Sequence, residues 1–258
     1  MILAIDVGNT NIVIGGLSGE EIFFTARIST DKSKTTDDYA AKLKSILEIY
    51  EIDRSRIAGA ILSTVVPALA TVLSDAVEKL LGCRPMVVSA AMNTGVRIAM
   101  DNPKQVGADL IVDATAVLHE YPQPTLFFDM GTATTVSAID QDGTYVGGMI
   151  IAGAELSLEA LSNGTAQLPH FSMDAPEKML GKNTIDCMKS GVIYGTAAMV
   201  DGIIQRAEEE MGEPLTVVAT GGISKKIVPY CRRKIICYEN LTLKGLRLLY
   251  EKNKEKEN

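Results

Sequence analysis

Residues 3–13 read LAIDVGNTNIV, and residues 126–136 read LFFDMGTATTV. In each stretch an apolar run delivers an Asp, one residue is skipped, a Gly follows, and hydroxyl or amide side chains precede a second apolar run. Apolar runs separated by turn residues predict a β-hairpin, and an ordered set that recurs after roughly 120 residues indicates an internal duplication. We therefore expect two related halves, residues 1–118 and residues 119–258, each opening with one of these hairpins.

The side chains of both hairpins suit phosphate binding. A carboxylate at a strand end, such as Asp6, holds Mg²⁺ through water, while Gly8 lets the backbone approach a phosphate and Thr10 or Asn11 donates hydrogen bonds. For a single copy, a hairpin whose Asx and Gly residues only turn the chain explains the pattern equally well. The second copy adds Asp129 and further hydroxyl groups, and the pair favours a cradle for the phosphates of ATP between the halves.

The segments around the hairpins alternate between strand and helix patterns, which is typical of an α/β protein. Strands are predicted over residues 21–28, 58–65, 85–89, 147–149 and 216–220, and helices over residues 68–81, 108–119, 154–163 and 184–211, with another from residue 36. Gly221-Gly222 after the last strand would let an adenosine pack against backbone, although a diglycine turn of this kind is more often structural. A helix starting near Ser224 would have that serine as its N-cap.

Composition argues against several other classes of protein. The chain has 25 basic and 32 acidic residues and a formal net charge of −7. This negative charge repels nucleic acid, and the basic residues form no long cluster that could offset the repulsion. Cys83, Cys187, Cys231 and Cys237 form no C-x-x-C pair, and His119 and His170 stand alone, so we expect no zinc site and reduced thiols in the cytoplasm. Residues 58–77 are apolar but interrupted by polar side chains, and the first residues lack the pattern of a secretory signal, so neither a membrane span nor export is expected.

A kinase also needs a group that accepts the proton of the attacking hydroxyl. Asp109, near a predicted helix start, is a candidate general base. From composition alone, an N-cap or helix-dipole role is the commoner explanation of an Asp at this position.

Several motifs together resemble type III pantothenate kinase over nearly the whole chain. Besides both hairpins they are Arg27–Thr30, Ser63–Pro67, Asp101–Pro103, Gly107–Asp109, Thr165–Pro169, Gly181–Thr184, Thr220–Gly222 and Leu241–Leu246. The resemblance implies a duplicated ribonuclease H-like fold, shared with actin, sugar kinases and heat-shock ATPases, with two similar halves and a cleft between them. It also implies a homodimer that phosphorylates pantothenate with ATP at the start of coenzyme A biosynthesis.

By the same resemblance each role maps to a residue here. The ATP contacts would be Asp6, Val7, Gly8, Asn9, Thr10, Asn11, Ile12, Val13, Thr132, Gly221 and Gly222. Asp109 would be the general base, and the pantothenate site would include Met100, Gly107, Ala108, Leu110 and Thr184. Asp6 would bind Mg²⁺, and Asp129 would bind the monovalent cation, K⁺ or NH₄⁺, that the family requires.

The departures from the family pattern fall largely on the acceptor side. Met100 stands where the family has Tyr and Leu110 where it has Arg, while Asp113 replaces Asn and Ala152 replaces Pro. Loss of the Arg removes a multi-donor cation suited to a carboxylate. The alternative to a pantothenate kinase is therefore a divergent member with another small alcohol as acceptor, or a regulatory protein that binds ATP without catalysis.

Overall fold

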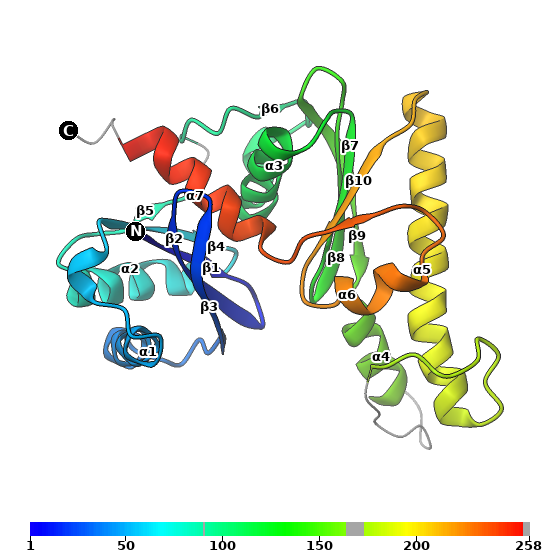
Figure 1. Ribbon diagram of the computed structural model, residues 1–258, viewed down its shortest axis with the longest axis horizontal. Coiled ribbons are helices and arrows are strands. Elements are labelled where there is room, and N and C mark those ends of the chain that lie inside the picture. Colours follow the sequence, from blue (N-terminus) through cyan, green and yellow to red (C-terminus); the bar gives the residue numbers. More distant parts are fainter. Residues whose placement is uncertain (90, 164–172, 255–258) are drawn as a thin grey trace. The chain divides into compact units, whose positions relative to one another are not determined.

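The computed structural model describes residues 1–89, 91–163 and 173–254, which form two compact units (Figure 1). The first unit comprises Met1–Val96, Asn102–Ala116 and Leu241–Asn258. The second comprises Arg97–Asp101 and Val117–Asn240. Helix α3, Ala108–Glu120, begins in the first unit and ends in the second.

The first unit is built on a five-stranded sheet in the order β3-β2-β1-β4-β5. Strands β1, β2 and β3 are antiparallel neighbours, whereas β4 and β5 continue the sheet in parallel. The strands span Ile2–Val7, Asn11–Ser18, Glu21–Ser29, Gly59–Thr64 and Met86–Val87. The helices are α1 over Thr36–Ile49, α2 over Pro67–Leu81 and α7 over Leu241–Asn253.

Strand β1 is buried on both faces, which explains its nearly continuous apolar run. Because side chains alternate along a strand, Leu3 and Ile5 point to a core shared with α1 and α2. Ala4 points to the opposite core, which it shares with Val112 of α3 and with Leu243, Leu246 and Leu249 of α7. The single polar residue within β1, Asp6, therefore lies on the same face as Ala4.

The second unit is built on a six-stranded sheet in the order β11-β10-β7-β8-β9-β6. Its strands are β6 (Arg97–Ile98), β7 (Thr125–Met130), β8 (Ala133–Ile139), β9 (Thr144–Ala152), β10 (Thr216–Thr220) and β11 (Ile236–Cys237). The helices are α4 over Ala154–Asn163, the long α5 over Thr184–Met211 and the short α6 over Ser224–Ile227. Ile193, Ala197, Val200 and Ile204 follow a helical period along α5 and pack with the apolar side chains of β7 and β10.

The two sheets have the same topology, as a duplication requires. From β9 to β11 the second sheet reads β9-β8-β7-β10-β11, with antiparallel pairs up to β7 and parallel pairs beyond it, which matches β3-β2-β1-β4-β5. Strand β6 is an addition, parallel to β9. The predicted duplicated ribonuclease H-like fold is confirmed.

Most predicted elements are present, and α4 and α5 have the predicted bounds. The predicted N-cap role of Ser224 is wrong: the N-cap of α6 is Ile223, and the Ser224 hydroxyl donates instead to the Gly221 carbonyl over 2.8 Å. Short 3₁₀ turns occupy Arg54–Arg56, Pro103–Gln105 and Val228–Tyr230. Among the described helices none combines the length and the apolar character needed to cross a membrane.

The predicted boundary between residues 118 and 119 separates the two sequence repeats. The two compact units are defined by packing instead, so their bounds differ from those of the repeats. Helix α7 belongs to the second half of the sequence but packs in the first unit. The motif Thr165–Pro169 and His170 lie outside the described residues.

Candidate active site

The first hairpin turn is fixed by backbone and side-chain hydrogen bonds. The Gly8 amide donates to the Asn11 carbonyl over 2.9 Å, and a Cβ at Gly8 would come within 3.1 Å of that oxygen. From the end of β3, the Thr30 hydroxyl donates to the Gly8 carbonyl over 2.7 Å and the Thr30 amide to the Thr10 carbonyl over 2.9 Å. The side chains of Asn9 and Thr10 are exposed, so the fixed turn presents polar groups to solvent.

Thr30 is a supporting residue whose role the sequence motif Arg27–Thr30 does not predict. A hydroxyl residue just after a strand gives no indication of which turn it contacts. The contact depends on the pairing of β3 with β2, in which Ser29 lies opposite Asn11.

The second hairpin has a tighter turn than the first. Met130 pairs with Thr134 across three intervening residues, whereas Val7 pairs with Ile12 across four. The Gly131 amide donates to the Ala133 carbonyl over 3.0 Å. Of the three threonines in this segment only Thr132 is exposed, since Thr134 is buried and Thr135 half-buried. Thr132 is therefore the hydroxyl best placed to meet a ligand.

Gly153 and Gly221 allow neighbouring segments to approach the second hairpin closely. The Gly153 amide donates to the Thr132 carbonyl over 3.0 Å, and a Cβ at Gly153 would collide with that oxygen. Gly221 has a left-handed φ of +88°, and a Cβ there would lie 2.5 Å from the Asp129 Oδ1. The structure thus brings Asp129 and the predicted adenosine turn together within the second unit.

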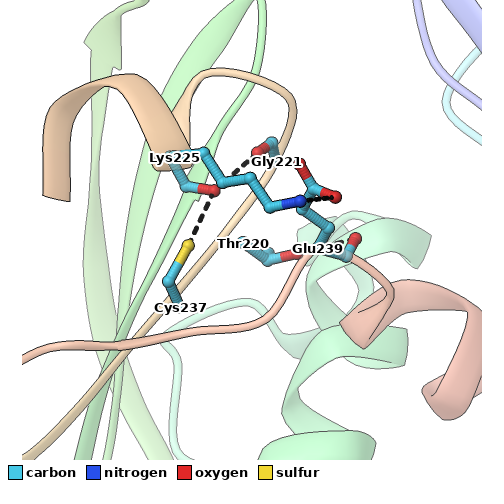
Figure 2. A network of polar contacts seen from close by, with 6 residues as sticks. Thr220, Gly221, Lys225, Cys237 and Glu239 are labelled. Atoms are coloured by element: carbon cyan, nitrogen blue, oxygen red, sulfur yellow. Dashed lines mark hydrogen bonds and ion pairs between the residues drawn. The ribbon is translucent and has the colours of Figure 1, made fainter. Parts of the chain in front are cut away.

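The turn at Gly221 sits in a small polar network (Figure 2). The Thr220 hydroxyl donates to the Glu239 carbonyl over 3.3 Å, and Lys225 pairs with the Glu239 carboxylate over 2.6 Å. The Cys237 thiol donates to the Ser224 hydroxyl over 3.3 Å, and that hydroxyl in turn donates to the Gly221 carbonyl. These contacts hold the segment before α7 against the start of α6 and leave Gly222 exposed.

The candidate base, Asp109, lies in the first turn of α3 and in the same unit as Asp6. Its Oδ1 accepts a hydrogen bond from the Leu110 amide over 2.9 Å, and burial raises the pKa of the carboxyl above its usual value. The backbone amides of Leu110 and Asp109 partly offset that rise in pKa. This geometry fits a helix-start residue, and the raised pKa also fits a proton acceptor.

The other predicted acceptor residues divide between the units. Gly107, Ala108 and Leu110 lie with Asp109 in the first unit, and all three are half-buried. Met100 and Thr184 belong to the second unit, where both are exposed and Thr184 is the first residue of α5.

Asp113 and Ala152, which depart from the family pattern, have ordinary structural places. Asp113 is buried and accepts a hydrogen bond from the Thr242 hydroxyl over 2.7 Å, which ties α3 to α7. Ala152 pairs with Ala133 at the end of β9.

The carboxylate of Asp6 is suited to a cation that is also coordinated by the phosphates of a bound nucleotide. Within residues 1–89, 91–163 and 173–254, no three His, Cys, Asp or Glu side chains gather closely enough to hold a metal ion alone. Mg²⁺ is commonly held by one or two carboxylates together with substrate phosphates and water. Asp6, half-buried at the end of β1 beside a backbone turn, has the donor type for such a site.

The second unit also carries an apolar groove of about 550 Å³ between β9, α4 and α5. Its lining includes Ile151, Ala154, Leu161, Thr184, Met188 and Val192. Of the lining residues, Leu161 is a large apolar side chain that is also exposed. An apolar groove of this size is a candidate interaction site.

The chain is similar in sequence to one family over almost its whole length. The sequence model of type III pantothenate kinase matches residues 2–206. A type III pantothenate kinase from Moorella thermoacetica is 42% identical over 257 residues, covering 98% of this chain and 100% of the relative. One from an Exiguobacterium species is 43% identical over 255 residues, covering 99% and 100%.

Solved structures show the same fold at low sequence identity. The activator of 2-hydroxyisocaproyl-CoA dehydratase from Clostridium difficile, with bound ADPNP, has a TM-score of 0.61 and 14% identity and covers 99% of this chain and 96% of its own. An inorganic polyphosphate/ATP-glucomannokinase from an Arthrobacter strain has a TM-score of 0.51 and 15% identity, with 96% of both chains covered.

Proposed function

The chain belongs to the type III pantothenate kinase family and phosphorylates pantothenate in coenzyme A biosynthesis. We propose that it does so by in-line transfer from ATP to a hydroxyl deprotonated by Asp109. The observation that carries the residue-level proposal is Asp109 itself, with its raised pKa, in the same unit as the Asp6 hairpin. ATP and a divalent cation are the co-substrate and cofactor of a kinase of this family.

The residues from Asp6 to Val13 bind the ATP phosphates in this proposal. Phosphoryl transfer depends mainly on positioning and on neutralising charge, so a fixed turn with outward polar groups is suited to it. The hydrogen bonds from Gly8 and Thr30 supply that fixity. Thr132 contacts the phosphates from the second hairpin, and Gly221 and Gly222 meet the adenosine.

Asp109 takes the proton from the pantothenate hydroxyl as the phosphoryl group moves. A general base is more effective when its pKa is raised toward the operating pH, provided that it stays ionised. Burial of the carboxyl has this effect on Asp109. The hydrogen bond from the Leu110 amide orients one carboxylate oxygen, which leaves the other for the substrate.

Two carboxylates are proposed to meet cations. Asp6 holds hydrated Mg²⁺, which neutralises phosphate charge when bound. Asp129 binds the monovalent cation, K⁺ or NH₄⁺, in this proposal, and the close approach of Gly221 to its Oδ1 supports a compact site there.

The acceptor site is the part of the protein in which this chain departs from the family pattern. The proposed acceptor residues are Gly107, Ala108 and Leu110 of the first unit and Met100 and Thr184 of the second. Neither Met100 nor Leu110 carries a charge. Since Leu110 cannot pair with a carboxylate, pantothenate binds more weakly here, or a related small alcohol is preferred. A non-catalytic ATP-binding regulator is the second candidate, and Leu110 is the observation that favours it.

A homodimer formed through the second unit is also proposed. The apolar groove between β9, α4 and α5 is suited to contact with a second copy of the chain, and Thr184 is one of its lining residues. A dimer through this groove would place Thr184 beside a second copy of the chain. Light scattering coupled to size exclusion would detect the dimer, and Leu161→Glu, which adds a charge to the groove lining, should shift it to monomer.

The net charge of −7 supports a small-molecule kinase over a protein that binds nucleic acid, and cysteines without the spacing of a disulfide scaffold support a cytoplasmic location.

The decisive experiment measures ADP release by purified protein with ATP, Mg²⁺ and K⁺. Wild type and Asp109→Asn are compared with and without pantothenate. Release that depends on pantothenate and is lost in Asp109→Asn supports the proposal and shows that Leu110 is tolerated. ATP binding without any pantothenate-dependent release would contradict it and favour another acceptor or the regulatory role.

A further inference from the structure

Ser63 is a buried hydroxyl residue for which the proposed mechanism has so far no use. It is the second-last residue of β4, it is 0% exposed, and its Oγ has no hydrogen-bond partner. The neighbouring Thr64 does form hydrogen bonds: its hydroxyl accepts from the Val66 amide over 3.0 Å and donates to the Val66 carbonyl over 3.1 Å. The turn from β4 into α2 is therefore stabilised by Thr64 and does not need the Ser63 hydroxyl.

The position of Ser63 is set by strand pairing. β4 runs parallel to β1, and Ser63 is the register partner of Asp6. Two residues earlier, Ala4 and Ile61 are also register partners, and both point into the core shared with α3 and α7. Because side chains alternate along a strand, Asp6 and Ser63 emerge side by side on that same face, on strands about 4.8 Å apart.

Helix α3 packs on this face of the sheet too. Ala108 and Val112 contact the core that contains Ala4 and Ile61. Asp109 thus lies in a helix that covers the same face of the sheet from which Asp6 and Ser63 emerge.

A buried hydroxyl without a partner is destabilising compared with an alanine of the same shape. Ser63 has apolar neighbours on its own strand, Ile61 and Leu62, so an apolar residue would suit the fold better. A hydrogen bond that the Ser63 hydroxyl forms only when a ligand is bound would explain why a serine stands at this position.

We propose that Ser63 is a positioning residue of the phosphate site: with Mg²⁺ and ATP bound, its Oγ donates a hydrogen bond to the Asp6 carboxylate and fixes the oxygen that faces the cation. This inference rests on the proposed role of Asp6. A hydrogen bond to a cation-binding carboxylate orients the ligand, and loss of such a partner typically weakens metal binding about 10- to 100-fold.

The test compares Ser63→Ala with wild type in three measurements: melting temperature without ligand, binding of a non-hydrolysable ATP analogue with and without Mg²⁺ by calorimetry, and Mn²⁺ binding by electron paramagnetic resonance. We expect an unchanged or higher melting temperature and Mg²⁺-dependent binding that is about 10- to 100-fold weaker. Ser162→Ala is the matched control, because Ser162 Oγ is also buried and without a partner, but on α4 of the second unit. It should leave cation binding unchanged.

A double-mutant cycle connects the effect to Asp6. In the Asp6→Asn background, Ser63→Ala should cause no further loss of cation binding, because the two residues act as one unit. Ser63→Cys, which is slightly larger but keeps a weak donor, should fall between wild type and Ser63→Ala.

Normal Mg²⁺-dependent binding by Ser63→Ala, or a lowered melting temperature without ligand, would overturn the inference and leave Ser63 a structural residue. Failure of wild type itself to bind the nucleotide with Mg²⁺ would instead overturn the proposed function, and the inference with it. The wild-type measurement therefore separates the two failures.

Discussion

Replacing Gly221 with Ala should destabilise the second unit and weaken nucleotide binding. The φ of +88° alone costs a residue with a Cβ about 1–2 kcal/mol. The added Cβ would also lie 2.6 Å from the Met130 amide nitrogen and carbonyl carbon and 2.5 Å from the Asp129 Oδ1. Because two of these atoms belong to the backbone of β7, they cannot move aside without disturbing the hairpin, and we expect a total loss of about 3 kcal/mol or more.

Gly212→Ala separates the two contributions. Gly212 ends α5 with a φ of +77°, and a Cβ there would meet nothing within 4 Å, so only the backbone term applies. Denaturant unfolding should therefore show a loss of about 1–2 kcal/mol for Gly212→Ala and a clearly larger loss for Gly221→Ala. Calorimetry should show weakened ATP binding only for Gly221→Ala. Equal losses of stability in the two variants would refute the reasoning, since they would mean that the approach to Asp129 is not tight.

Asp109→Asn should abolish most pantothenate-dependent turnover, about 10²- to 10⁴-fold, and yet stabilise the protein at neutral pH. Burial raises the pKa of the folded-state carboxyl above the unfolded value of about 3.9, so wild-type stability falls as the pH rises through the window between the two values, by about 1.4 kcal/mol per pKa unit. Thermal unfolding should show that the advantage of Asp109→Asn disappears below about pH 4. Thr30→Val removes the hydroxyl that holds the Gly8 carbonyl and should cost about 0.5–1.5 kcal/mol in denaturant unfolding and raise the KM for ATP; an unchanged KM would contradict its supporting role. Leu110→Arg should lower the KM for pantothenate about 10- to 150-fold, equivalent to a charged hydrogen bond of about 1.5–3 kcal/mol, and steady-state kinetics that show no gain would mean that the acceptor site has diverged beyond this residue.

The duplication was predictable because its indications are local. In the hairpins at Asp6 and Asp129, an apolar strand, a turn glycine and a second strand follow one another directly, between Ile2 and Ser18 and between Thr125 and Ile139. Strand β1 and helix α5 were recognisable for a similar reason, since a buried run and a long helical pattern identify themselves. The positions of the candidate ATP residues on strand ends follow directly from these elements.

Features that depend on distant contacts were not predictable. Helix α7 follows almost the whole chain, but its Leu243 and Leu246 complete the core of β1 at the other end of the sequence. The two-residue strands β6 and β11 are too short to show a period. Ser224 has the residue type of an N-cap, but its hydroxyl is used by the Gly221 carbonyl across a turn that only the folded unit creates.

The same limit explains why the sequence motifs that contain Thr30 and Ser63 do not reveal the role of either residue. Each acts through a residue that lies next to it only because strands pair. Thr30 meets the first turn because β3 pairs with β2, and Ser63 adjoins Asp6 because β4 pairs with β1. Strand register, rather than sequence spacing, therefore decides which residue each hydroxyl lies beside.

The two hairpins share a fold, but their turns are held by different means, and this difference has functional consequences. The first turn is longer and is held by a side-chain hydrogen bond from Thr30, so its polar groups are fixed by a contact that substitutions can weaken gradually. The second turn is shorter, and Gly153 and Gly221 pack closely against the second hairpin. Any side chain that replaces either glycine would therefore collide with backbone atoms of the hairpin. Because Asp109 belongs to the unit of the first hairpin, substitutions around that hairpin should alter kcat together with phosphate binding. Substitutions at the two glycines should instead reduce ATP binding and stability together, and a lowered kcat with normal ATP affinity in Gly221→Ala would show that this division of roles is wrong.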